Sequence, residues 1–418
     1  MRIEIEGLAF GGAGIGRVRG KVVFVRGGLP GDTLRVRITR EKERYAEAEI
    51  EEVISPSPER TEPRCPVFGI CGGCQWQHLN YHSQLRAKEN VLRDTLERIG
   101  GLKGIRVESM VPSPNEYGYR NRITLSVWFQ KGGYRIGYHE EGSRRRIAID
   151  GCPIALKPID EAVSLLSRSL SSIDTPKYPL KKIYIASDGR AAYITLACPW
   201  DEDPKRLISI RDHVRGSLGT ENVGILGYDE RDFEFSILGL RFYSFPSIFI
   251  QSNSEVNKLL IKTIIEWAEL KGDEKVLDLY SGIGNFSLHL ARRARGIMGV
   301  DVSARAVELA KRSGEANSIS NVVFDASPSE LFVEESLKRG DRFDLAILDP
   351  PREGAKDILE GLSKLSPGKI IYVSCDPPTL ARDLKTLGDL GYRVLKVRPF
   401  DMFPQTYHIE SLALLLKI

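Results

Sequence analysis

The chain has 418 residues, 42% of them apolar, and a formal net charge of only +4 at neutral pH. This length predicts two or three domains, and the composition is that of an ordinary globular protein rather than a disordered or fibrous one. The sequence contains neither a signal-peptide stretch at the N-terminus nor a run of about 18 apolar residues, which indicates a cytoplasmic protein without a membrane anchor.

The first segment, residues 1–55, consists of short runs of alternating apolar residues separated by glycine turns. This pattern predicts a small β-barrel of the oligonucleotide-binding type. The run GGAGIG leads into β-rich sequence and not into a helix, so we do not interpret it as a phosphate loop. Residues 1–45 carry ten Lys or Arg against five Asp or Glu, which favours an acidic partner such as RNA.

The second segment, residues 56–245, is predicted to be a central α+β domain. It opens with a linker rich in proline and serine, and an amphipathic helix is expected over residues 82–99. Strand-like runs follow, but their pattern does not define a topology. Residues 117–146 interleave seven basic with six aromatic side chains, a combination that suits phosphates and unstacked bases. A solvated strand face is the alternative interpretation of that stretch.

Cysteines cluster in the same segment. Cys65, Cys71 and Cys74 have the spacing C-x5-C-x2-C, and Cys152 lies far downstream. Thiols stay reduced in a cytoplasmic protein, so the clustering indicates a metal site or catalysis. The loop with its glycines can wrap three thiolates around an iron–sulfur cluster that a distant cysteine completes, and a zinc ion bound by four cysteines is the alternative. Cys198 has no partner and is expected in the core.

The third segment, residues 246–418, alternates helical stretches with short buried strands. The expected strands are KVLDLY, GIMGVD, NVVFD, FDLAILD, KIIYVS and LALLLKI. This alternation predicts a mostly parallel sheet covered by helices on both faces, which is a Rossmann-like α/β domain.

A glycine turn follows the first of these strands. Gly282 and Gly284 allow a ligand to approach the backbone closely, and Asp301 closes the second strand, where an acid can bind ribose hydroxyls. Ser287 stands where a dinucleotide fingerprint has its third glycine, and Asp325 can face an adenine. The pattern favours S-adenosylmethionine, with a nicotinamide cofactor as the alternative.

Four side chains that can take part in catalysis lie next to the later strands. Asp349 is followed by two prolines and then by Arg352, whereas amino-group methyltransferases place an aromatic residue at that point. Cys375 closes the next strand, and His408 and Glu410 come just before the last one. Considered alone, Cys375 is most simply a buried structural cysteine and Glu410 a surface carboxylate. Together at one sheet edge they can act as a nucleophile and a base.

The pair suits methylation at C5 of uridine. This carbon is too weakly nucleophilic to take a methyl group directly, but addition of a thiolate to C6 concentrates electron density at C5. After methyl transfer a base must remove the C5 proton so that the cysteine can leave. The target base must also leave its stack, which costs least in an RNA loop.

Nearly from end to end, the chain resembles the RNA uridine-C5 methyltransferases. The first segment is similar to their TRAM domain, and QHLNYHSQLRAK, YRNR and MFPQTYHIE resemble family motifs. The resemblance implies that Cys375 is the nucleophile and Glu410 the base. It further implies a 4Fe–4S cluster on the four clustered cysteines, and cofactor contacts from Gln251, Tyr280, Asn285, Asp301 and Asp349 in addition to the glycine turn.

One position departs from the family pattern, and the substrate has two candidates. We expect SCNP after the nucleophile, whereas Asp376 replaces the asparagine and can alter the hydrogen bonds or pKa of the cysteine. A chain with both a TRAM segment and four cysteines resembles the 23S rRNA enzymes most, with tRNA as the alternative substrate. A radical-type iron–sulfur enzyme and a pure RNA-binding module are the rival functions. No obligate protein partner is indicated.

Overall fold

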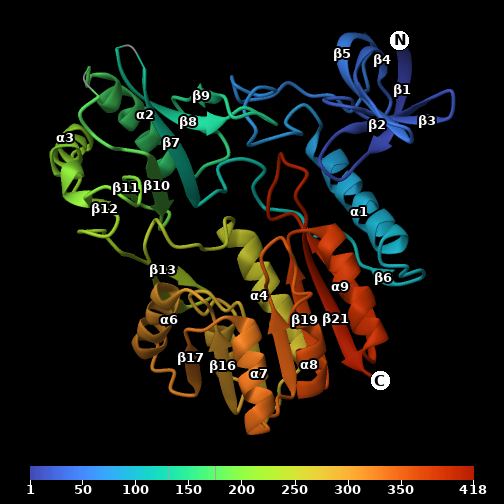
Figure 1. The fold of residues 1–418 in the computed structure, drawn as a ribbon, viewed down its shortest axis with the longest axis vertical. Coiled ribbons are helices and arrows are strands. Elements are labelled where there is room, and N and C mark those ends of the chain that lie inside the picture. Colours follow the sequence, from blue (N-terminus) through green and yellow to red (C-terminus); the bar gives the residue numbers. More distant parts are fainter. Residues whose placement is uncertain (131, 175) are drawn as a thin grey trace.

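The structure, a computed structural model, describes residues 1–130, 132–174 and 176–418. It has three regions that follow one another along the chain: an N-terminal β-barrel, a mixed region beside it, and a large sheet flanked by helices (Figure 1). The domain boundaries after residues 55 and 245 remain predictions. In the described part of the chain, no helix combines the length and the apolar character needed to cross a bilayer.

The N-terminal region is a closed five-stranded barrel, which confirms the predicted β-barrel. Alternate side chains such as Ile3, Val23 and Val36 fill its interior. The glycine run belongs to this packing, because a Cβ on Gly16 would collide with the carbonyl oxygen of Glu4. The strands are β1 (Arg2–Leu8), β2 (Gly14–Val18), β3 (Lys21–Val25), β4 (Thr33–Glu41) and β5 (Tyr45–Ser55).

The central region is built on a six-stranded sheet of order β12-β11-β10-β7-β8-β9. Helix α2 packs on it, with Val163 and Leu166 in one hydrophobic cluster with Ile123 and Ile136. The elements are β7 (Arg122–Gln130), β8 (Gly133–His139), β9 (Arg146–Ala148), α2 (Lys157–Ser171), β10 (Lys182–Ser187), β11 (Ala192–Ala197), the 3-10 helix η1 (Pro204–Leu207), α3 (Ile208–Leu218) and β12 (Val223–Ile225).

Helix α1 (Tyr81–Arg98) and strand β6 (Arg106–Val107) lie apart from that sheet. The helix begins where predicted, and the Asn80 side chain caps it by accepting a hydrogen bond from the Ser83 N–H. It packs against helix α9 (Pro377–Asp389), and β6 is the edge strand of the C-terminal sheet (Figure 1). Residues before position 245 therefore help to build the C-terminal region.

The C-terminal region is an eight-stranded sheet of order β17-β16-β15-β18-β19-β21-β20-β6. Strands β15 to β19 are mutually parallel, and β21 is antiparallel to both of its neighbours. This confirms the predicted Rossmann-like class, although β20 was not recognised in the sequence. The strands are β15 (Lys275–Leu279), β16 (Gly296–Val300), β17 (Val322–Asp325), β18 (Leu345–Leu348), β19 (Lys369–Ser374), β20 (Tyr392–Phe400) and β21 (Glu410–Lys417).

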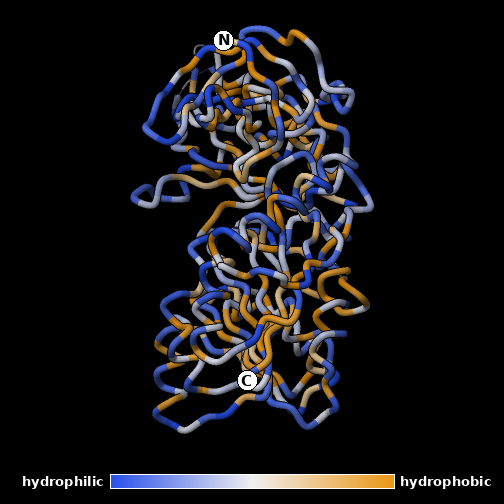
Figure 2. Tube along the Cα trace, turned by 90° about the vertical axis from the view of Figure 1, so that its right-hand side faces the viewer, coloured by the Kyte–Doolittle hydropathy of each residue, from blue (hydrophilic) through white to orange (hydrophobic). Residues whose placement is uncertain are grey.

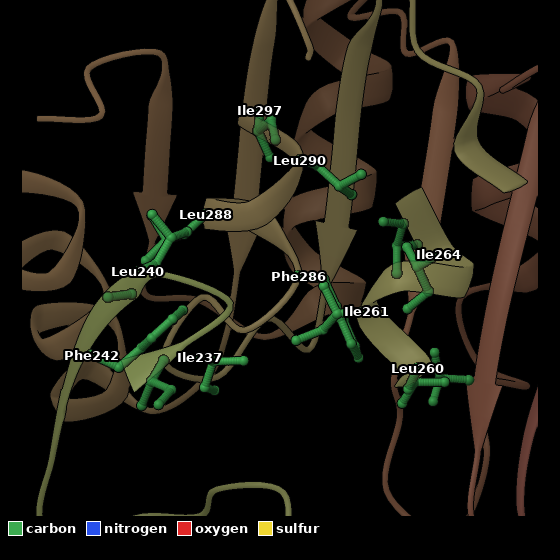
Figure 3. Close-up of a cluster of buried hydrophobic side chains, with 14 of the residues drawn as sticks. Ile237, Leu240, Phe242, Leu260, Ile261, Ile264, Phe286, Leu288, Leu290 and Ile297 are labelled. Atoms are coloured by element: carbon green, nitrogen blue, oxygen red, sulfur yellow. The ribbon is translucent and has the colours of Figure 1, made fainter. Parts of the chain in front are cut away.

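Helices cover both faces of this sheet, because its strands are apolar on both sides. Val276 and Ile347 belong to one hydrophobic cluster, and their neighbours Leu277 and Leu348 belong to the other. Figure 3 shows part of the first cluster, and in Figure 2 apolar residues concentrate inside this region. The remaining elements are β13 (Phe233–Ile237), β14 (Leu240–Ser244), α4 (Ser254–Ala268), α5 (Ser287–Ala291), α6 (Ala304–Ala316), α7 (Ser329–Arg339) and α8 (Leu359–Leu365).

Candidate active site

The glycine turn predicted to bind the cofactor connects β15 to α5 at the carboxyl edge of the sheet. Its backbone is left-handed at Tyr280 (φ +63°), Gly282 (φ +54°) and Gly284 (φ +82°). A Cβ on Gly284 would also lie 2.9 Å from Cζ of Phe324. The turn therefore requires glycine at position 284 for its conformation and for its packing against β17.

Asp301 directly follows β16 and faces this turn. Its carboxylate accepts hydrogen bonds from the backbone N–H of Gly282 and of Ser303, both at 2.8 Å. Each carboxylate oxygen has a second lone pair, so Asp301 can still accept from the hydroxyls of a ribose. Asp325, the last residue of β17, lies beside it, because the Asp301 N–H donates to the Asp325 carbonyl at 3.1 Å.

Asp278, a fully buried carboxylate near the carboxyl end of β15, was not predicted from the sequence. Its oxygen Oδ2 accepts from the Ser287 N–H at 3.1 Å and from the Ser287 hydroxyl at 2.5 Å, which holds the start of α5. Burial raises the pKa of Asp278 to about 7, and the hydrogen bonds of Ser287 oppose this shift. An acid in an otherwise apolar strand was the signal that could have revealed it.

Gln251 and Asn285, both expected to contact the cofactor, lie on the same side of the sheet as the turn. The Gln251 amide donates to Asp349 Oδ2 at 3.2 Å, and Asn285 exchanges two side-chain hydrogen bonds with Asn257 of α4, at 2.9 and 3.0 Å. Burial raises the pKa of Asp349 to about 7, and the charge of Asp278 adds to this shift. The predicted cofactor residues therefore converge at one edge.

Cys375 and Glu410 meet at the same edge. Ser374 pairs with Ser411 in the antiparallel ladder of β19 and β21, so Cys375 and Glu410, one step further, face each other. Burial raises the pKa of the Cys375 thiol to about 12, with the carboxylates of Glu410 and Asp349 adding to the shift. Burial also raises the pKa of Glu410 well above its usual range, and Asp349 contributes.

Two charged residues lie close to Cys375: Arg352 acts on its pKa, and Asp376 begins the helix that follows it. The guanidinium of Arg352 lowers the pKa of Cys375 and thereby opposes the neighbouring carboxylates. Asp376, the departure from the family pattern, is the N-cap of α9, and its Oδ1 accepts from the N–H and the hydroxyl of Thr379, both at 3.0 Å. Asp and Asn are about equally favoured as N-caps, so the cap of α9 does not itself require asparagine at position 376.

The four clustered cysteines line one cavity, remote in sequence from the reactive edge. Cys65, Cys71, Cys74 and Cys152 surround it together with Arg120. Burial raises the pKa of Cys74 to about 12, and the other three thiols contribute, so the four are electrostatic neighbours. Within the described residues, no group of three or more His, Cys, Asp or Glu side chains is arranged to hold a metal ion. The iron–sulfur cluster predicted for these four cysteines therefore remains a proposal.

These features define a class. The sheet has a glycine turn after its first strand, an acid after the second, and an antiparallel hairpin at its end. This combination is typical of a Rossmann-like methyltransferase that depends on S-adenosylmethionine. Cys375 and Glu410 on the hairpin side add a nucleophile and a carboxylate to that scaffold.

Comparisons with known proteins identify the family. Residues 236–418 match the family tRNA (Uracil-5-)-methyltransferase, and residues 1–50 match the TRAM domain. The 23S rRNA (uracil(1939)-C(5))-methyltransferase RlmD of Shewanella amazonensis is 34% identical, with 99% of this chain and 94% of that protein covered. The corresponding enzyme of Photorhabdus laumondii is 33% identical over 99% and 95% of the two chains.

A solved structure agrees with these matches. The tRNA (uracil-54, C5)-methyltransferase of Pyrococcus abyssi, in complex with S-adenosyl-L-homocysteine, is 28% identical and superposes with a TM-score of 0.73 over 100% of both chains. The chain belongs to the RNA uracil-C5-methyltransferase family. This confirms the predicted family, the predicted enzyme class and the TRAM barrel.

Proposed function

We propose that this enzyme transfers a methyl group from S-adenosylmethionine to C5 of a uridine in 23S rRNA. The observation that carries the proposal is the convergence of Cys375 and Glu410 at the carboxyl edge of the sheet, the same edge that holds the turn of Gly282 and Gly284. Full-length similarity to enzymes named for 23S rRNA supports this substrate.

In the proposed reaction the Cys375 thiolate adds to C6 of the uracil, and C5 then takes the methyl group that S-adenosylmethionine supplies. Glu410 removes the C5 proton, the bond between C6 and sulfur breaks, and its electron pair returns to Cys375. Burial favours this assignment. Glu410 is shielded from water and lies opposite the Cys375 thiol, so its carboxylate is placed to receive a proton from the uracil ring to which the thiol adds.

Cofactor binding is assigned to the turn and its neighbours. Asp301 would accept from the ribose hydroxyls, as its two N–H partners fix the orientation of its carboxylate. The further contacts that we propose come from Gln251, Tyr280, Gly282, Gly284, Asn285, Asp325 and Asp349.

A direct assay distinguishes the RNA substrates. Purified protein and labelled S-adenosylmethionine are incubated separately with unmodified 23S rRNA and with unmodified tRNA, and digested nucleosides are analysed for 5-methyluridine. We expect product from rRNA. Product from tRNA alone would favour the alternative that the Pyrococcus abyssi structure supports, and product from neither would refute the function.

We also propose a 4Fe–4S cluster on the four clustered cysteines. Four thiols around a shared cavity are a soft donor set that suits an iron–sulfur cluster, with zinc as the alternative. Iron and sulfide analysis of protein purified without oxygen should find both elements, and Cys152→Ser should lose them. Cys198→Ser is the matched control, because Cys198 lies outside the cavity. Zinc without iron would contradict the proposal.

A further inference from the structure

Glu410 owes its position to the backbone of a long hairpin. It pairs with Phe400 as the last step of the β20–β21 ladder, and the nine residues 401–409, which we call the hairpin loop, join the two strands. No described side chain donates a hydrogen bond to the Glu410 carboxylate. Hairpin loops usually have two to five residues, so a loop of this length needs outside contacts to hold one conformation.

Helix α1 provides the first contacts. Lys88 and Asp401 are both fully buried and form an ion pair at 2.5 Å, and Lys88 Nζ also donates to the Phe403 carbonyl at 2.9 Å. One turn earlier, the buried Gln84 side chain donates to Gln405 Oε1 at 3.0 Å and accepts from the Gln405 N–H at 2.9 Å. The same face of one helix therefore holds the first half of the loop, from Asp401 to Gln405.

The segment that follows Cys74 provides the second contacts. The backbone N–H groups of Gln75 and Trp76 both donate to the Gln405 carbonyl, at 3.1 and 3.0 Å. Gln405 itself is left-handed, with φ at +70°, a conformation that non-glycine residues keep only where their surroundings impose it. The loop is thus fixed at its centre by the cysteine-bearing segment.

The third contact comes from Tyr119, the first residue of the YRNR motif. Its buried hydroxyl donates to the Pro404 carbonyl at 2.9 Å. The next residue, Arg120, lines the cysteine cavity, and the amide of Asn121 donates to the Gln251 carbonyl at 2.9 Å. Three consecutive residues therefore touch the hairpin loop, the cysteine cavity and the cofactor side of the site.

We propose that Tyr119 and Gln84 are positioning residues that hold the hairpin loop so that Glu410 faces the C5 proton of the methylated uracil. The inference rests on the proposed role of Glu410 as the base. In that step Glu410 takes the proton, the bond between C6 and sulfur breaks, and the electron pair returns to Cys375. The earlier addition of Cys375 does not use Glu410 in this scheme, so a displaced loop should slow elimination selectively.

Tyr119→Phe tests this inference, because it removes only the hydroxyl that bonds to Pro404. Tyr392→Phe is the matched control: the Tyr392 hydroxyl is equally buried and donates to the Pro367 carbonyl at the same 2.9 Å, away from the active site. Single turnovers with labelled S-adenosylmethionine and 23S rRNA would be followed on denaturing gels. Labelled protein–RNA adduct reports addition and transfer, and free 5-methyluridine reports elimination.

We expect Tyr119→Phe to slow elimination about tenfold and to accumulate adduct, while adduct formation stays within twofold of the wild type. Tyr392→Phe should change neither rate. Gln84→Glu keeps the acceptor for the Gln405 N–H but loses the donor to Gln405 Oε1 and to the Trp76 and Leu79 carbonyls, and it should show the same selective slowing. It serves as the second variant if thermal melting shows that Tyr119→Phe is unfolded.

Two results would contradict the inference. Addition and elimination could slow by equal factors in Tyr119→Phe, which is the result expected of a merely structural residue, or elimination could proceed at the wild-type rate. A wild type that methylates in that experiment leaves the proposed function intact. If the wild type forms neither adduct nor 5-methyluridine, the proposed function itself fails, and the inference fails with it.

Discussion

The two halves of the catalytic edge are assembled in different ways. In the cofactor half, the hydrogen bonds that shape the glycine turn around β15 and β16 join residues close in sequence: Gly282 and Asp301 are 19 positions apart, and Asp278 and Ser287 only 9. In the reaction half, around β19 and β21, the hairpin loop before Glu410 is held by residues 285 to 330 positions away.

The difference indicates which part of the enzyme can change independently. A cofactor turn built from adjacent strands and loops keeps its shape wherever the sheet is intact. The reaction half depends on α1, on the cysteine-bearing segment and on Tyr119, all of which precede strands β15 to β21 in the chain. Substitutions in the two halves should therefore affect different steps, and the following experiments test this.

The largest expected effect is that of Cys375→Ala. Without the thiol no adduct can form at C6, so 5-methyluridine formation should fall at least about 10³-fold. RNA binding, measured by filter retention, should stay within about twofold, because the barrel and the central region are unchanged. Cys198→Ala, at a partly buried cysteine of the central region, should retain full activity as the control. Full activity of Cys375→Ala would refute the mechanism.

Glu410→Gln comes next. The amide has nearly the same shape but cannot take the C5 proton, so turnover should fall by about 10²- to 10⁴-fold while labelled adduct accumulates. Tyr119→Phe should show the same slow elimination to a smaller extent, because it displaces Glu410 but leaves its carboxylate in place. If the adduct failed to accumulate, Glu410 would act before methyl transfer and not after it.

Asp301→Asn tests the cofactor half. Losing a charged acceptor for the ribose hydroxyls should weaken S-adenosylmethionine binding about ten- to a hundredfold, as read by calorimetry. The ratio of adduct to product should not change at saturating cofactor. Asp344→Asn is the control, because the Asp344 carboxylate accepts from the Lys275 N–H at 2.8 Å at the opposite edge of the sheet. A changed ratio in Asp301→Asn would show that the halves are not independent.

The smallest expected effect is the change in the rate of adduct formation with pH. Burial raises the pKa of Cys375 to about 12, so the thiolate fraction, and with it the rate of adduct formation, should rise about tenfold from pH 7 to pH 8. Arg352 lowers this pKa, so Arg352→Gln should slow addition several-fold at each pH, whereas Arg352→Lys should restore much of the rate. A flat profile in the wild type would mean that bound RNA ionises the thiol.

The elements that have a local sequence pattern could be predicted. The strands of the closed barrel, the parallel strands and the glycine turn are each marked by a short run of apolar or turn-forming residues, and all three are present as predicted. Cys375 and Glu410 could be named because each adjoins a recognisable apolar strand and lies within a motif that resembles a family pattern.

The rest of the fold and of the site depends on contacts between residues far apart in sequence, which no local sequence pattern reveals. Strand β20 was missed because charged residues alternate with its apolar ones and a proline comes near its end. Gln84 and Lys88 look like ordinary polar positions of an amphipathic helix, yet both are fully buried against the hairpin loop. Only the three-dimensional arrangement shows that they belong to the reaction half.

The short strand β6 has a consequence for how the enzyme is made. Together with the N–H groups of Glu108 and Val111, which donate to Val397 and Pro399, it occupies the outer edge of β20. An uncovered edge strand invites aggregation with other chains. Because the covering segment is translated almost 300 residues before β20, it has left the ribosome when β20 emerges. A fragment starting at residue 236 would expose that edge and should aggregate.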